Sequence, residues 1–245
     1  MVSTSRPRSE RSEPERANLD HVDGRRSRWT QHRTERRAAF VEAGVLAVDQ
    51  YGPAASAEQI AEAAGVSRTV LYRYFRDRED LRKAIADRVV DEVVASVVPA
   101  LTVSDNATPR QLITPAIAEI VNWLDRRPNI YRFLRSRRDG GLDSVETTLA
   151  DNIAVLLQAI MLVLGIDARV AEPGAYGVVG FVESIGGWWL EHHEMPRDQF
   201  TELVVSGVWH LLEGAARDHG VHIGLDDPLP TAAPDLQGLN LQGSV

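Results

Sequence analysis

Residues 63–75 read Ala-Ala-Gly-Val-Ser-Arg-Thr-Val-Leu-Tyr-Arg-Tyr-Phe, and this stretch decides the fold of the chain. It predicts two short helices with a sharp turn between them. Gly65 suits the end of the first helix, because glycine adopts positive φ without steric cost. Ser67 is placed to cap the second helix by accepting a hydrogen bond from an unpaired backbone N–H. Leu71 and Phe75, four residues apart, share one face of that helix and are expected to be buried.

The helix before the turn carries its own start signal. Ser56 and Gln59 have the spacing of a capping box, in which each side chain bonds the backbone N–H of the other residue. Ile60, Ala61 and Ala64 follow at helical spacing and form one apolar face. Local signals alone therefore predict a helix-turn-helix unit.

The second helix directs polar side chains away from its buried face. A helix of about ten residues fits the major groove of DNA, where guanidinium, hydroxyl and phenol groups bond base edges and phosphates. We therefore predict that it is a recognition helix. The residues predicted to contact DNA, on this helix and near it, are Arg28, Arg33, Ser67, Arg68, Thr69, Tyr72, Arg73, Tyr74 and Arg78.

The same stretch resembles a known family. Residues 60–67, 71–75 and 78–81 are similar to the DNA-binding segment of TetR-type transcriptional regulators, and the resemblance extends from Arg37 to Ile85, about a fifth of the chain. It implies an all-α protein. An N-terminal three-helix helix-turn-helix DNA-binding domain would precede a larger C-terminal helical domain for ligand binding and dimerisation.

This chain departs from the family pattern at two places. Thr69 and Val70 stand where glycine or proline and then threonine are usual, so a hydroxyl group that often meets DNA has moved or is absent. Arg78 replaces the usual lysine and keeps its charge with a different geometry. The fold prediction survives these changes, whereas a base-by-base transfer of contacts does not.

Composition excludes several classes of protein. The 245 residues include no cysteine, which rules out disulfides, thiolate metal sites and a cysteine nucleophile. No uninterrupted apolar run reaches the ~18 residues of a membrane span. The longest candidate, 153–166, is interrupted by Gln158 and is predicted to be a buried helix. The N-terminus lacks the apolar segment of a secretory signal, so we expect a cytoplasmic protein without a membrane partner.

The net charge of −8 is unevenly distributed. Residues 1–88 carry 17 Lys and Arg against 14 Asp and Glu, a balance of +3, and the remainder carries 10 against 21, a balance of −11. Charges farther apart than roughly 8 Å are screened at physiological salt, so the acidic remainder does not prevent DNA binding. It does argue against a non-specific nucleoid-type DNA binder, which would need basic charge throughout.

Residues 1–29 are rich in Ser, Pro, Arg and Glu and are predicted to form a disordered basic and polar arm. The run from Arg25 to Arg37 holds six arginines and one acid, Glu35. Two interpretations stay open for this run. It is either a solvated lead-in to the first helix or an arm that lies along the duplex or in the minor groove.

Helical periodicity continues through the larger domain. A helix from about Asp77 to Val98 is expected to join the two domains and to act as a lever between them. Other helices are predicted at about 30–50, 109–127, 144–164, 173–192 and 196–218, with a short one after Pro128. The predicted divisions are a DNA-binding domain at 30–88, a ligand-binding and dimerisation domain at 89–225 and a flexible tail at 226–245.

The resemblance implies a small-molecule pocket among the helices of the larger domain. The residues predicted to line it are Trp123, Leu124, Phe133, Leu156, Leu157, Met161, Phe181 and Trp188, and core packing is the alternative for each. So apolar a set favours a long apolar ligand. Six arginines between Arg126 and Arg138 either form a solvated surface or hold an anionic headgroup, as in a fatty acyl thioester of coenzyme A.

A homodimer on a palindromic operator is also predicted, because one recognition helix reads only one half-site. In TetR-type proteins the last two long helices form a four-helix bundle with the partner. The residues predicted at this interface are Trp189, Val204, Val208, Trp209, Leu211 and Leu212, with core packing again the alternative. Five glycines from Gly174 to Gly187 weaken the helix that holds them. Close approach of another backbone or a ligand would explain them.

The sequence contains no glycine-rich phosphate loop, no Gly-x-Ser-x-Gly and no His-Glu-x-x-His motif. His192 and His193 are neighbours that diverge by about 100° on a helix, so they are poorly placed to share a metal ion. We therefore predict a ligand-responsive, sequence-specific regulator and not an enzyme, with no cofactor or metal site. The alternative within the family is a repressor that responds to a different apolar small molecule or xenobiotic.

Overall fold

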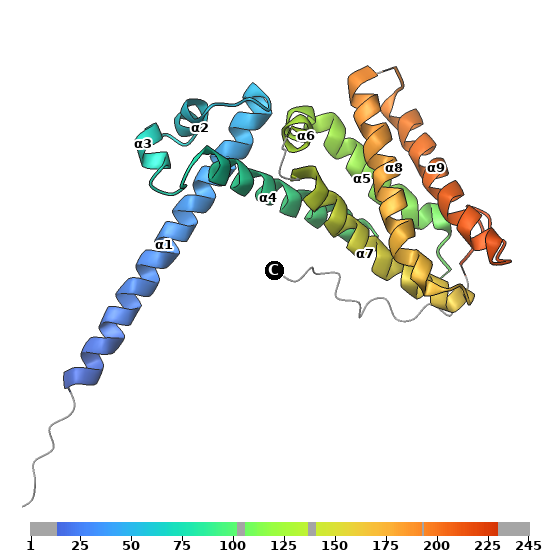
Figure 1. Cartoon of the computed structure of the whole chain (residues 1–245), viewed down its shortest axis with the longest axis horizontal. Helices are drawn as coiled ribbons and strands as arrows, with labels where there is room; N and C mark the ends of the chain where they lie inside the picture. The colour runs from blue at the N-terminus through green and yellow to red at the C-terminus, as the bar shows by residue number, and fades with distance from the viewer. Residues whose placement is uncertain (1–13, 102–105, 137–140, 193, 230–245) are drawn as a thin grey trace, which may run out of the picture.

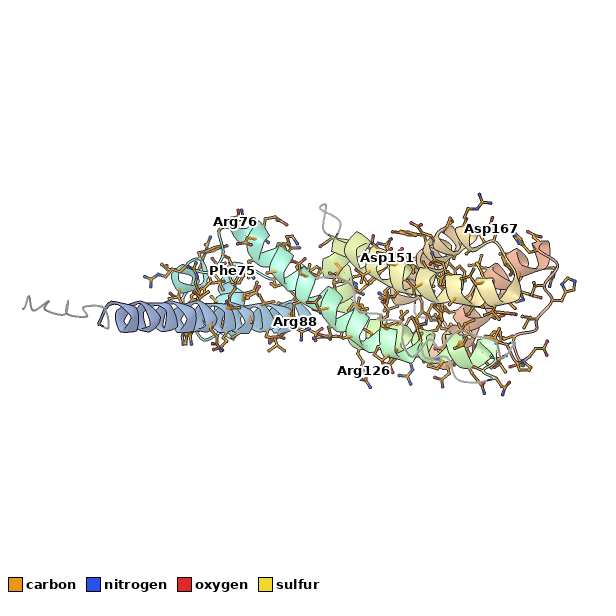
Figure 2. The ribbon with its side chains drawn as sticks, turned by 90° about the horizontal axis from the view of Figure 1, so that it is seen from below. Phe75, Arg76, Arg88, Arg126, Asp151 and Asp167 are labelled. Carbon is orange, nitrogen blue, oxygen red and sulfur yellow. The ribbon has the colours of Figure 1, made fainter. Side chains whose placement is uncertain are left out.

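The structure is a computed structural model that describes residues 14–101, 106–136, 141–192 and 194–229, and every regular element within these ranges is helical (Figure 1). The elements are α1 Pro14–Tyr51, α2 Ala57–Ala63, α3 Arg68–Leu71, α4 Arg78–Val97, the 3-10 helix η1 Val98–Ala100, α5 Pro109–Arg126, α6 Pro128–Arg135, α7 Gly141–Leu164, the 3-10 helix η2 Ala168–Val170, α8 Ala171–His192 and α9 Arg197–Asp218. α1 to α3 form a small unit, α5 to α9 form a larger bundle, and α4 runs from one into the other (Figures 1 and 2). The all-α prediction is confirmed.

The local signals of the helix-turn-helix unit are also confirmed. At the start of α2 the Gln59 N–H donates to Ser56 Oγ (3.2 Å), and the Ser56 N–H donates to Gln59 Oε1 (2.8 Å). Gly65 has a φ of +65°. The Val70 N–H donates to Ser67 Oγ at 3.4 Å, which caps α3.

The recognition helix is shorter than the expected ten residues. α3 ends at Leu71, and the chain then closes a tighter turn in which the Tyr74 N–H donates to the Leu71 carbonyl at 3.0 Å. Packing explains the early end of the helix. The Tyr74 ring meets Phe40 of α1 edge-on, with centroids 5.0 Å apart, and Phe75 is buried in the same core.

α1 begins much earlier than expected. The prediction of a disordered arm over 1–29 is wrong for residues 14–29, which are helical, and residues 1–13 lie outside the described part of the chain. Proline is favoured at the first helical position, where no N–H donor is needed. A segment with few apolar residues cannot form a hydrophobic core. It can still extend a helix that is already folded, because adding residues to a helix costs far less free energy than nucleating one. The N-terminal half of α1 consequently projects from the molecule (Figure 1).

One core runs through both parts of the molecule. Leu71 and Phe75 of the small unit and Ile85 of α4 belong to the same buried cluster as Ile130 and Phe133 of α6. All five side chains are at most 2% exposed. The division expected at residue 89 falls inside α4, where the core is continuous.

α7 is long and apolar enough over Val145–Leu164 to cross a membrane, judged by length and composition. It packs against α4 and α8, and Leu149 and Leu157 are buried in the core. Val155 and Leu162 are 38% and 69% exposed. The prediction of a buried helix therefore holds for the inner face of α7 only.

The segment after α9 is bonded to the start of α5. The Leu229 N–H donates to the Ala107 carbonyl and the Arg110 N–H donates to the Leu225 carbonyl, both at 3.0 Å. The expectation of a flexible tail over 226–245 is therefore wrong for its first four residues. Residues 230–245 lie outside the described part of the chain.

The substitution Gly44→Ala tests how closely α1 and α4 approach. A Cβ atom at Gly44 would lie 2.7 Å from Cγ1 of Ile85, which is fully buried. Alanine gains about 1 kcal/mol of helix propensity over glycine, whereas overpacking a core costs about 1–3 kcal/mol. We expect a lower Tm in thermal unfolding followed by circular dichroism. The double variant Gly44→Ala/Ile85→Ala should lose less Tm than the sum of the losses in the two single variants. An undiminished Tm for Gly44→Ala would contradict this packing.

Candidate functional site

The outer surface of α3 and of the turn after it carries four of the predicted DNA-contacting residues. Arg68, Thr69 and Arg73 are exposed, and Tyr72 is half-buried. Arg33 of α1 reaches the same place, because its Nη2 donates to the Arg73 carbonyl at 3.5 Å. The structure thus brings these five residues together on one surface.

The remaining predicted contacts are placed differently. Ser67 caps α3, and Arg78 is exposed in the first turn of α4. Tyr74 is half-buried, and its ring packs edge-on against Phe40. The side chain of Arg28 lies outside the described residues.

Arg68 is held in place by its neighbours. Its Nη1 pairs with Glu58 Oε1 at 2.6 Å, and its guanidinium carbon lies 5.5 Å from the ring centroid of Tyr72. A backbone hydrogen bond lowers the pKa of Glu58, and the Arg68 charge lowers it further, so the carboxylate is ionised at neutral pH. Exposed ion pairs are weak. A phosphate or a guanine edge can therefore replace Glu58 as the partner of Arg68.

The turn between α3 and α4 rests on Asp80, which the sequence analysis missed. Its carboxylate accepts from the Arg76 N–H at 2.9 Å and from Arg37 Nη2 at 3.4 Å. The Arg76 hydrogen bond, followed by the Arg37 charge, lowers the pKa of Asp80. The Arg37 guanidinium also lies 4.6 Å from the ring centroid of Phe75. Because Arg37 and Asp80 are 43 residues apart, no local pattern marks this pair.

The larger domain contains a cavity of about 210 Å³ with an apolar wall. Each helix from α4 to α9 contributes to it, together with the segment after α9. Its lining residues include five of the predicted ligand-binding candidates, Trp123, Leu124, Leu156, Leu157 and Met161.

Phe133, Phe181 and Trp188 are not among the lining residues, which corrects the prediction. Phe133 is fully buried beneath the guanidinium of Arg82, 4.5 Å from its ring centroid. Phe181 covers Gly207 of α9, where a Cβ atom would lie 2.7 Å from Cε1 of the ring. Trp188 is 41% exposed on the outer face of α8. Helical spacing identified these rings as apolar positions without showing which surface each one meets.

A polar contact lies at the end of the cavity near α6. Tyr131 Oη donates to Glu183 Oε1 at 2.9 Å, and Arg135 Nη1 donates to Tyr131 Oη at 3.3 Å. Burial, and then the Glu183 charge, raise the pKa of Tyr131 to about 12, so the phenol stays protonated at neutral pH. The indole N–H of Trp123 is buried without a hydrogen-bond partner among the described residues. A ligand acceptor at this wall would satisfy it.

The arginines around α6 do not line the cavity. Arg127 pairs with Glu92 of α4 and, at 3.6 Å, with Asp49 of α1. Asn129 Nδ2 donates to the Asp49 carbonyl at 2.7 Å. These contacts join α6 to both α1 and α4. Of the predicted headgroup set, Arg126, Arg127, Arg132 and Arg135 are absent from the lining, and Arg137 and Arg138 lie outside the described residues.

Most residues predicted at the dimer interface serve the interior of the chain instead. Trp189, Val204 and Val208 are at most 3% exposed. Trp209 and Leu212 line the cavity, a role that the sequence analysis did not give them. Each helix has an inner face toward the core, and the largest apolar residues of α8 and α9 are mostly on it.

α8 and α9 nevertheless expose an apolar set on their outer faces. Its members are Tyr176, Trp188, Leu203 and the predicted Leu211, which are 44%, 41%, 49% and 48% exposed. A Cβ atom at Gly177 or Gly180 of α8 would meet no other atom within 4 Å. These glycines therefore face open space, unlike Gly186 and Gly187, which meet side chains of α5 and α6.

Comparison with known proteins agrees with this geometry. The family model for bacterial regulatory proteins of the tetR family matches residues 42–85, which include α2 and α3. The uncharacterized HTH-type transcriptional regulator Rv0472c of Mycobacterium tuberculosis H37Rv is 31% identical over 204 residues, which cover 81% of this chain and 86% of that protein. The chain belongs to the TetR family. As a TetR-type protein it is a DNA-binding transcriptional regulator.

The TetR fold is also present in solved structures with lower identity. A tetR-family regulator from Streptomyces coelicolor matches with a TM-score of 0.60 and 20% identity, over 76% of this chain and 83% of that one. FadR from Bacillus subtilis, solved in complex with stearoyl-CoA, matches with a TM-score of 0.54 and 17% identity, over 70% and 96% of the two chains. These likenesses support the arrangement of the helices.

The substitution Tyr131→Phe removes the phenol that donates to Glu183. Losing the donor to a partly buried carboxylate costs about 1–3 kcal/mol, so we expect a lower midpoint in urea unfolding. Glu183→Gln is the matched control, because an amide oxygen still accepts from Tyr131 and the loss is smaller. Equal losses in the two variants would argue against this hydrogen bond.

Proposed function

We propose that this TetR protein binds a palindromic operator as a homodimer and responds to a long apolar effector of the fatty-acyl class, such as an acyl-CoA. The observation that carries the effector class is the cavity of about 210 Å³, whose apolar wall extends from α6 to the segment after α9. Such a wall suits an alkyl chain and offers little to orient a sugar or an amino acid. The fold likeness to FadR with stearoyl-CoA supports the same class. As a DNA-binding regulator, the protein would act in the cytoplasm.

On the DNA side, we propose that Arg68, Thr69, Tyr72 and Arg73 contact bases or phosphates. Their support is their common exposed surface on α3 and the turn after it. Ser67, Arg78, Arg33 and Arg28 would contact the phosphate backbone. The helical N-terminal part of α1 would then extend the basic surface along the duplex.

The proposed dimer forms through the outer faces of α8 and α9. Its support is the exposed apolar set on these faces, together with Gly177 and Gly180, whose open space lets a partner helix approach closely. A two-fold axis there would present two recognition helices to half-sites about 34 Å apart.

Two helices connect the cavity with the DNA-binding unit. α4 lines the cavity with Val93 and Val97 and starts beside the recognition turn, and α6 lines it with Tyr131 and Leu134 and bonds α1 through Asn129. In the proposed mechanism, the ligand shifts both helices and changes the separation of the two recognition helices. The expected coupling is about 1–3 kcal/mol, several-fold to ~150-fold in operator affinity.

The substitution Tyr72→Ala tests the DNA-reading surface. The operator is first obtained by selecting bound fragments from genomic DNA, and affinities are then compared by fluorescence anisotropy. Loss of one specific contact should weaken binding about 5- to 100-fold. Tyr51→Ala is the matched control, because Tyr51 is an exposed tyrosine of α1 outside the proposed surface. Unchanged binding by Tyr72→Ala, in a protein with the parent Tm, would reject this surface.

Acyl-CoA thioesters from octanoyl to stearoyl test the effector class by thermal shift. We expect the rise in Tm to grow with chain length, because each buried CH₂ contributes about 0.8 kcal/mol. Leu156→Trp fills the cavity and should abolish the shift, whereas Leu162→Trp on the outer face of the same helix should keep it. No shift at any length would reject the acyl effector. A shift with apolar xenobiotics alone would favour the other TetR alternative.

A further inference from the structure

Residues 220–229, called the strap, cover the end of the cavity opposite α6. Gly220 has a φ of +79° and ends α9, after which the chain turns back to the start of α5. In Figure 1 the strap follows α9 at the end of the molecule remote from α1. Ile223 and Leu229 line the cavity, so the strap is part of its wall.

The side chain of Arg110 attaches the strap in addition to the two backbone hydrogen bonds described above. On the other side, the Val221 N–H donates to the Ala216 carbonyl of α9 at 3.0 Å. Arg110 Nε donates to Asp226 Oδ1 at 2.7 Å and its Nη2 to Oδ2 at 3.4 Å. Its Nη1 donates to Glu202 of α9 at 3.0 Å. A single arginine from the start of α5 therefore bridges the strap and α9.

The two ends of the cavity differ in how easily they can open. At the α6 end, Tyr131 and Leu134 are 5% and 1% exposed, and opening there would break the core that continues into the helix-turn-helix unit. The strap has no regular secondary structure, and its residues are half-buried or exposed. Exposed ion pairs such as those of Arg110 are individually weak. The strap can therefore move without unfolding a helix.

We propose that the strap is the door of the effector cavity and that Arg110 is its latch. Ile223 and Leu229 contact the ligand where its chain leaves the cavity. The polar head of the ligand remains at this mouth, in contact with solvent, while its chain lies against the apolar wall. This inference rests on the proposed function, since it takes the cavity as the effector site.

Stopped-flow binding of cis-parinaric acid, a fluorescent fatty acid, tests the door. Arg110→Gln and Asp226→Asn both remove the latch, and each should raise the association and dissociation rates about three- to tenfold while leaving Kd nearly unchanged. The probe is an anion, so charge steering alone would slow its association with the first variant and speed it with the second. Acceleration in both variants therefore separates the latch from simple electrostatics.

Arg169→Gln is the matched control, because Arg169 of η2 forms an exposed ion pair with Asp167, the residue that caps the same short helix. Its rates should equal those of the parent protein, and circular dichroism confirms that each variant is folded. Parent-like rates for Arg110→Gln, or opposite shifts in the two latch variants, would overturn the door and leave the cavity as a ligand site. If the parent protein fails to bind the probe, the acyl effector itself is rejected and the door with it, whereas DNA binding stands on the separate operator test.

Discussion

The packing of α6 against α1 is the contact on which the rest of the structure depends. Ile130 and Phe133 lie in the core that also contains Leu71 of the recognition helix, and the Asn129 amide donates to the Asp49 carbonyl near the end of α1. Protein interiors are packed as densely as organic crystals. A helix that moves on one side of this core must therefore shift the side chains packed against it on the other side. The helix-turn-helix unit is a wall of the larger domain's core as well as a DNA-binding module.

The features that could be predicted from the sequence are those fixed by neighbours along the chain. Ser56 and Ser67 cap helices through backbone groups three residues away, and Gly65 adopts the positive φ that its position requires. These signals place α2 and α3, and the resemblance to the TetR family then supplies the remaining architecture. The exposed residues on and after α3 could be predicted in the same way, because Leu71 and Phe75 define which face is buried and therefore which face points outward.

The features that could not be predicted depend on contacts between distant residues. Phe133 and Trp189 have the helical spacing of buried residues. Spacing does not show whether a helix face contacts the core, a cavity or a second chain. Both side chains are buried in the core. The Leu229 N–H donates to the Ala107 carbonyl, more than 100 residues away in the sequence. An irregular segment has no hydrophobic periodicity from which such a contact could be predicted. The prediction for the N-terminal part of α1 was wrong for a different reason. The first half of α1 contains few apolar residues and therefore shows no amphipathic pattern, but it continues as a helix because the second half is already folded.

The two ends of the cavity give the proposed signal a direction. A ligand changes an equilibrium only through a difference in its affinity for the two states. If a ligand chain too long for the cavity displaces the strap, the positions of α4 and α6 do not change. The difference in ligand affinity between the two states must then arise at the opposite end of the cavity. There Val93 and Val97 of α4 and Tyr131 and Leu134 of α6 line the cavity, and both helices reach the DNA-binding unit. The strap would then govern how fast a ligand arrives and leaves, while the α4 and α6 side chains govern what its presence does to the recognition helices.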